Sequence, residues 1–110
     1  MIRVSFRYDT EGCPVAFKCE GHAGFARRGK DIICAALSML TANTVNSIET
    51  FTDDAFTLDQ NEKNGYMYFR FGDGVIPCGD SLLLLKSFEL GVRQLSAENR
   101  AFITIKEWEV

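Results

Sequence analysis

From Asp31 to about Ile48 the chain carries its longest periodic stretch, in which apolar positions recur at helical spacing. This spacing predicts a helix, and Asp31 is suited to cap its N-terminus. A second apolar face, formed by Ile32, Ala36 and Met39, lies on the opposite side, so a second helix or a second subunit should cover it. The residues expected to face the core are Ile33, Leu37, Leu40, Thr44 and Ile48.

Short β-prone runs surround this helix in pairs, each pair separated by residues that favour turns. A second helical repeat begins near Ser81, with Asp80 as its expected cap. The expected strands are residues 2–8, 14–20, 55–60, 65–71 and 101–110. The order ββαββαβ predicts an α+β fold with two layers, in which a mixed or largely antiparallel sheet packs against two helices.

The composition favours one soluble domain. A chain of 110 residues, 46% of them hydrophobic, can bury one core but not two, so a single domain should span residues 1–110. No run approaches the roughly 18 consecutive apolar residues of a membrane span, and the strand-like start MIRVSFRYDTEG is unlike a secretory signal, which predicts a cytoplasmic location. A formal net charge of −3 argues against nucleic acid as the main ligand and favours a basic partner.

The four cysteines include no CxxC pair, and a reducing compartment would keep them as thiols. Cys34 differs from the others because, with Asp31 as the cap, it falls in the first turn of the helix. Free N–H groups and the helix dipole there stabilise a thiolate, the nucleophilic form of cysteine, and could also hold an oxyanion. The alternative, which is the commoner role of a helical cysteine, is packing as a small apolar residue.

The single histidine, His22, lies in a glycine- and arginine-rich loop that leads directly to this helix. The loop can fold back, so His22 can reach Cys34 as its general base, although such a histidine is more often only a polar surface residue. Asp31 could orient the imidazole in addition to capping the helix. Ser38 follows Cys34 by one turn and could line the pocket, whereas most serines inside helices only bond a backbone carbonyl.

A metal site is the other chemistry that these residues suggest, through Cys19, His22 and Cys34. A structural zinc site needs a fourth ligand and regular spacing, and the sequence offers neither, so we expect no metal and no other cofactor. Cys13 and Cys78 fall in predicted turns, and nothing places a base near either.

The stretch GHAGFARRGKDIICAALSMLTANTVN resembles the signature of the ribosomal-processing cysteine proteases, the Prp (YsxB-like) family. The likeness covers the Gly-His-Ala motif, the glycine-containing loop, the helix start Asp-Ile-Ile-Cys-Ala-Ala, and the Ser, Thr and Asn that follow. The length of the chain and the order of its elements also fit the family. The resemblance says little about residues 50–110.

What the resemblance implies is a bacterial cytoplasmic endopeptidase with a Cys–His dyad, which removes a short N-terminal extension from large-subunit ribosomal protein twenty-seven. The family also implies a homodimer, a mobile loop over the site, and a groove for an aromatic, apolar sequence before the cut. The dyad positions are His22 and Cys34, with Gly21, Gly29, Asp31 and Ser38 at supporting motif positions. Two other classes stay open from the residues alone: a non-catalytic ribosome-associated binding module that grips a basic protein, and a small metal-binding protein.

Overall fold

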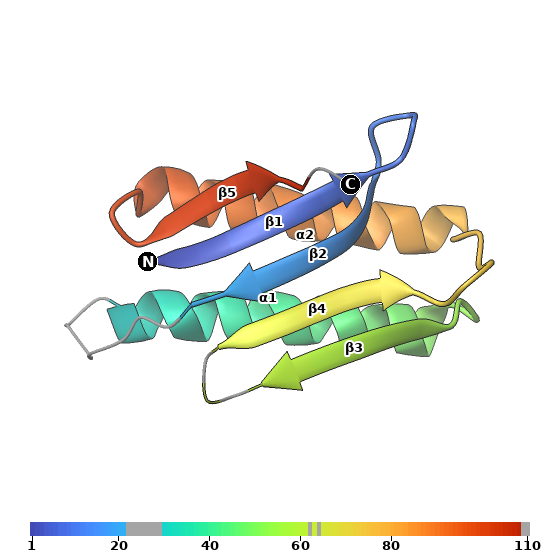
Figure 1. Cartoon of the computed structure of the whole chain (residues 1–110), viewed down its shortest axis with the longest axis horizontal. Coiled ribbons are helices and arrows are strands. Elements are labelled where there is room, and N and C mark those ends of the chain that lie inside the picture. The colour runs from blue at the N-terminus through green and yellow to red at the C-terminus, as the bar shows by residue number, and fades with distance from the viewer. Residues whose placement is uncertain (22–29, 62, 64, 109–110) are drawn as a thin grey trace.

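The computed structural model describes residues 1–21, 30–61, 63 and 65–108. Its elements are β1 (Ile2–Tyr8), β2 (Pro14–Glu20), α1 (Lys30–Phe51), β3 (Phe56–Asn61), β4 (Tyr66–Phe71), α2 (Gly79–Glu98) and β5 (Ile103–Glu107). Both helices lie behind the same face of one sheet (Figure 1). The predicted order ββαββαβ and the α+β fold are confirmed.

The sheet has five strands in the order β3-β4-β2-β1-β5. The three pairs that join β1 to β2, β2 to β4, and β3 to β4 are antiparallel, and β1 pairs with β5 in parallel. The parallel pair forms because α2 carries the chain back along the sheet before β5 begins, as a crossover between parallel strands must. The sheet is therefore mixed, which is one of the two forms that the sequence predicted.

Aromatic rings from three strands and one helix meet in the core. Phe6, Phe17, Phe69 and Phe88 are each no more than 1% exposed. The Phe17 ring lies 4.4 Å from that of Phe88 and 5.3 Å from that of Phe69, measured between ring centroids. Burial of each such side chain stabilises the fold by about 1.5–3 kcal/mol. These rings attach α2 to the centre of the sheet.

The inner face of α1 agrees with its predicted pattern, since Ile33, Leu37, Thr44 and Ile48 are buried and Leu40 packs against the core.

The predicted start of the helix is wrong. The helix begins at Lys30 rather than after Asp31, so Asp31 lies within the first turn instead of capping it. Lysine is itself a good helix former, and an apolar repeat does not fix the residue at which a helix begins.

No described part of the chain covers the second apolar face of α1. Ile32 is 74% exposed and Met39 is 69% exposed. The other helix packs elsewhere on α1, where a Cβ added to Gly91 would lie 3.0 Å from Leu40 Cδ2. The prediction that a second helix could cover this face of α1 is therefore wrong, because α2 does not lie over Ile32 and Met39.

The N-terminus of α2 also differs from its prediction. The N-cap is Cys78, whose side chain makes no capping hydrogen bond, and Asp80 lies in the first turn. The capping contacts come from Asp54, whose carboxylate accepts the Ser81 hydroxyl at 2.6 Å and the Cys78 N–H at 2.8 Å. The hydrogen bond from Ser81, followed by that from Cys78, lowers the pKa of Asp54 from its ordinary value. A carboxylate from the connection between α1 and β3 thus accepts the N–H of the N-cap residue and places negative charge at the start of α2.

By length and composition alone, the segment Ile32–Phe51 is apolar enough to cross a membrane, with a mean hydropathy of 1.2. The expectation that nothing in the chain approaches such a span was therefore too strong. Core helices of soluble proteins meet the same criterion, and in this fold α1 buries Ile33, Leu37 and Ile48 against the sheet and α2.

Candidate active site

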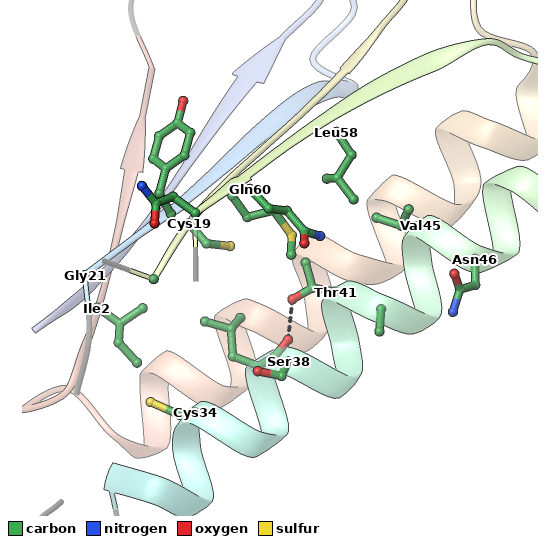
Figure 2. A pocket seen from close by; sticks show the side chains of 16 residues that line it. Ile2, Cys19, Gly21, Cys34, Ser38, Thr41, Val45, Asn46, Leu58 and Gln60 are labelled. Carbon is green, nitrogen blue, oxygen red and sulfur yellow. Dashed lines mark hydrogen bonds between the residues drawn. The ribbon is translucent and has the colours of Figure 1, made fainter. Parts of the chain in front are cut away.

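Cys34 is the fifth residue of α1 and is half-buried at one end of a cavity. Because the helix begins at Lys30, this position opens the second turn, and the expectation of a place inside the first turn is corrected. Helical side chains lean toward the N-terminus, so the Cys34 thiol still lies over the first turn, where the backbone N–H groups have no partner within the helix. Figure 2 shows the thiol at the N-terminal end of the helix, with Val45 and Asn46 farther along it.

The cavity, of about 440 Å³, lies between α1 and the strands β2, β3 and β4. Its helical wall follows a single face of α1, because Cys34, Ser38, Thr41 and Val45 recur at steps of three or four residues. Apolar side chains from both walls line much of the remaining surface. They are Ile2, Leu37, Leu58 and Met67.

Gly21 borders the cavity immediately after β2. Its φ is +91°, and a Cβ at this position would lie 2.5 Å from the Met1 carbonyl oxygen. Position 21 therefore requires glycine for two reasons. Residues with a side chain disfavour this φ, and the neighbouring backbone leaves no room for a Cβ.

The match to known proteins covers nearly the whole chain. The family model described as Cysteine protease Prp matches residues 1–104. The chain belongs to this family. The ribosomal processing cysteine protease Prp of Bacillus subtilis (strain 168) is 31% identical over 77 residues, which make up 70% of this chain and 69% of that protein.

Solved structures with the same fold include members of the Prp family. The crystal structure of a ribosomal processing protease Prp from S. aureus with a substrate peptide matches with a TM-score of 0.87 at 22% identity, covering 98% of this chain and 100% of that one. A second S. aureus Prp structure, with a covalently linked product peptide, matches at 0.86 and 23% identity, over 98% and 100% of the two chains. A protein from Streptococcus mutans matches at 0.86 with 32% identity, over 97% of this chain and 93% of that one.

For this Prp-family chain, the structure brings together some of the residues predicted for the site. Cys34, Ser38 and Gly21 line the same cavity, although their roles stay predictions. His22 and Gly29 lie outside the described residues. The backbone of Asp31 is part of α1, but its side chain is not described, so its predicted contact with His22 also stays a prediction.

The other cysteines have different surroundings. Cys19 reaches the cavity from β2, but burial, followed by the charge of Glu20, raises its thiol pKa to about 12. It therefore remains a neutral thiol at neutral pH, unsuited to act as a nucleophile. Cys13 lies in the turn between β1 and β2, and Cys78 lies at the start of α2, so neither lines the cavity.

No group of three metal-binding side chains comes together among the residues that the structure describes. The zinc set considered from the sequence includes His22, which lies outside them, so the absence of a metal remains an expectation.

Several wall residues had not been singled out from the sequence. Thr41 and Asn46 come from α1, and Gln60 and Tyr66 come from the hairpin of β3 and β4. The alternation of the strands could have grouped Gln60 with Leu58 on one face. Nothing in the sequence indicated that this hairpin would lie against the α1 residues that follow Cys34.

Proposed function

We propose that this chain is a cysteine endopeptidase that removes the N-terminal extension of bacterial large-subunit ribosomal protein twenty-seven during ribosome maturation in the cytoplasm. The observation that carries the proposal is the Cys34 thiol at the end of a long, mainly apolar cavity in a member of a cysteine protease family. The covalently linked product peptide in the S. aureus relative supports a nucleophilic mechanism.

In the proposed mechanism His22 takes the proton of the Cys34 thiol, or pairs with the thiolate, and the sulfur forms a bond to the scissile carbonyl carbon. Backbone N–H groups in the first turn of α1 stabilise the oxyanion that results. His22 then protonates the leaving amine as the C–N bond breaks. Water, deprotonated by His22, hydrolyses the thioester and restores the thiol.

Four motif residues would support this dyad. Asp31 would orient the imidazole, and Ser38 would contact the substrate where it passes along α1. Gly21 would allow the chain to turn away from β2 immediately before His22. Gly29 would give the loop between His22 and α1 the freedom to cover the site.

The dimensions of the cavity fit an extended peptide. From Cys34 to Asn46 the helix rises about 18 Å, at 1.5 Å per residue, which is the length of about five extended residues. Leu37, Val45 and Met67 would contact apolar side chains of that segment. The resemblance places an aromatic, apolar sequence before the cut, and this lining suits it.

The charge near the far end of the cavity suits a basic substrate. An adjoining hollow shares Val45, Asn46 and Leu58 with the cavity. It adds the carboxylates of Glu49 and Asp53, both on exposed residues. Negative charge beside the substrate path would steer a basic ribosomal protein toward the site, more strongly at low ionic strength.

We also propose that the active form is a homodimer. The exposed apolar side chains on the helices, Ile32 and Met39 on α1 with Leu83 and Leu90 on α2, would then be covered by the second subunit. Light scattering at micromolar concentration should give twice the chain mass for the wild type. A Met39→Glu variant should shift toward the monomer, whereas a monomeric wild type would contradict the proposal.

The reaction itself is tested by the intact mass of large-subunit ribosomal protein twenty-seven, carrying its extension, after incubation with wild type, Cys34→Ala or His22→Ala. Loss of a short N-terminal fragment with the wild type alone is the expected result. Cys13→Ala is a matched control, because Cys13 lies away from the cavity, and it should cleave normally. Cleavage by Cys34→Ala would refute the assignment of the nucleophile.

A non-catalytic, ribosome-associated binding module is the second candidate, and the apolar cavity with its acidic neighbour also favours it. In that case wild type and Cys34→Ala would bind the ribosomal protein with equal affinity, and neither would shorten it.

A further inference from the structure

The face of the sheet that points away from the helices carries a different surface from the rest of the molecule. In β1 the buried residues Ile2, Val4 and Phe6 alternate with Arg3, Ser5 and Arg7, so the latter three lie on the open face. The strand register extends this face across the sheet. Its central row runs Asp59, Tyr68, Lys18, Ser5 and Lys106, from β3 to β5.

The open face is positively charged in an acidic chain. Its cations are Arg3, Arg7, Lys18, Arg70 and Lys106, and its carboxylates are Glu20 and Asp59. Five cations against two carboxylates give this face a charge of +3, whereas the whole chain has −3. Among the described residues, only Arg70 of these cations forms an ion pair, with Asp59 at 2.6 Å. The other four cations have no carboxylate partner among the described residues, and two of them, Lys18 and Arg7, contact the Trp108 ring.

Aromatic rings lie among these cations. The Tyr68 and Trp108 rings meet edge to face, with centroids 5.1 Å apart. The Lys18 ammonium lies 3.9 Å from the Trp108 centroid and 4.9 Å from that of Tyr68. The Arg7 guanidinium lies 5.7 Å from the Trp108 centroid. The cluster consequently presents aromatic and guanidinium planes together with positive charge, on the face of the sheet opposite to α1 and α2 (Figure 1).

We propose that this basic aromatic face binds single-stranded RNA. Proteins that bind single strands without strong sequence preference combine cations that follow the phosphates with flat groups on which bases stack, and open sheets are a common platform for this. An acidic peptide would use the cations but would bring no flat group to stack on the exposed ring and guanidinium planes. The expectation against nucleic acid came from the net charge of the whole chain, which does not show that positive side chains gather on this face.

The choice of RNA over DNA rests on the proposed function, because an enzyme that processes a ribosomal protein would encounter its substrate close to RNA. Binding itself does not require that function. The cavity at Cys34 opens on the other side of the sheet, where Cys19 and Met67 point toward the helices. Peptide and RNA would therefore occupy opposite faces of the same strands.

The chain has a single tryptophan, so the intrinsic fluorescence of Trp108 reports directly on this face. Titration with a uridine 12-mer should change that fluorescence as a base approaches the ring. If the four cations without a carboxylate partner each neutralise one phosphate, the dissociation constant should rise about fifty-fold between 50 and 200 mM salt, a slope near −2.8.

Variants test the individual contacts. Lys18→Gln should weaken binding and reduce the salt slope by about 0.7. Trp108→Leu, followed by anisotropy of a labelled 12-mer, should weaken binding about tenfold. Lys86→Gln is the matched control, because Lys86 is exposed on α2 and its loss changes the net charge equally. It should bind like the wild type. Circular dichroism confirms that each variant is folded, and Lys18→Gln remains a test if Trp108→Leu is not.

Three outcomes would overturn the proposal: no binding at 50 mM salt, equal losses with Lys18→Gln and Lys86→Gln, or tighter binding of poly-glutamate or anionic vesicles than of RNA. Stronger binding of a deoxyuridine 12-mer would overturn RNA as the occupant. The Cys34→Ala variant should bind RNA like the wild type. A failure of the peptidase proposal is therefore distinguishable from a failure of this one.

Discussion

Replacing Gly21 with alanine should destabilise the fold through two effects that the structure separates. The first is the positive φ of +91°, which costs an alanine about 1–2 kcal/mol. The second is the overlap of the new Cβ with the Met1 carbonyl oxygen at 2.5 Å. That oxygen is not free to move, because the N–H of the next residue, Ile2, bonds Phe102 O at 2.8 Å. Relief of such crowding typically costs a further 1–3 kcal/mol, about 2–5 kcal/mol in all.

Gly12→Ala is the matched control. Gly12 has a similar φ of +81°, but an added Cβ meets nothing within 4 Å. For 110 residues, 1 kcal/mol corresponds to about 4 °C in Tm. Gly12→Ala should therefore lower Tm by about 4–8 °C and Gly21→Ala by about 8–20 °C, measured by circular dichroism. Equal shifts for the two variants would refute the argument from close approach and leave backbone strain as the whole reason for the motif glycine.

Further predictions concern groups whose pKa or packing the fold changes. The fold raises the pKa of the Cys19 thiol to about 12, above its unfolded value of about 8.5. The buried neutral thiol therefore contributes its full stabilisation below about pH 8.5, and this contribution is lost as pH rises from about 8.5 to about 12. The urea midpoint of Cys19→Ala should accordingly fall less than that of the wild type between about pH 8 and pH 10.5, and an identical fall would contradict burial as the cause. Phe88→Ala should lower the free energy of unfolding in urea by about 3–5 kcal/mol. Phe51→Ala removes an exposed ring and should lower it by less than about 0.5 kcal/mol. A small loss for Phe88→Ala would mean that the core repacks around the missing ring. Hydrogen bonds lower the pKa of Asp54, so the free energy of unfolding decreases as pH falls through the titration of this carboxyl group. Ser81→Ala removes one of these bonds and should make that decrease smaller below about pH 4. The same decrease in the variant and the wild type would contradict this account.

The sequence was sufficient for the number, order and type of the elements, because their periodicities are local. It failed at the ends of both helices, where the outcome depends on contacts that a local pattern does not contain. Asp80 has the right chemistry for a cap and the right place in the sequence. Asp54 occupies the start of α2 instead, because the fold brings it there from 27 residues before Ser81.

The candidate site divides in the same way. Cys34 could be proposed as the nucleophile because its place on a helix and the motif around it are local features, and that role stays a prediction. The opposite wall of the cavity, with Leu58, Gln60 and Met67, could not, because it depends on how β3 and β4 join the sheet. The charge on the open face was hidden for a related reason, since a net charge carries no information on which strand face each residue occupies.

One strand contributes side chains to both proposed binding faces. In β2, Cys19 faces the cavity that Cys34 lines, and its neighbour Lys18 lies on the open face against Trp108. The alternation of side chains in a strand places these consecutive residues on opposite sides of the sheet. A change of charge at position 18 therefore alters the open face without adding or removing an atom in the cavity. The proposed peptide cleavage and the proposed RNA binding should consequently be separable by single substitutions, even though Lys18 and Cys19 are neighbours in the chain.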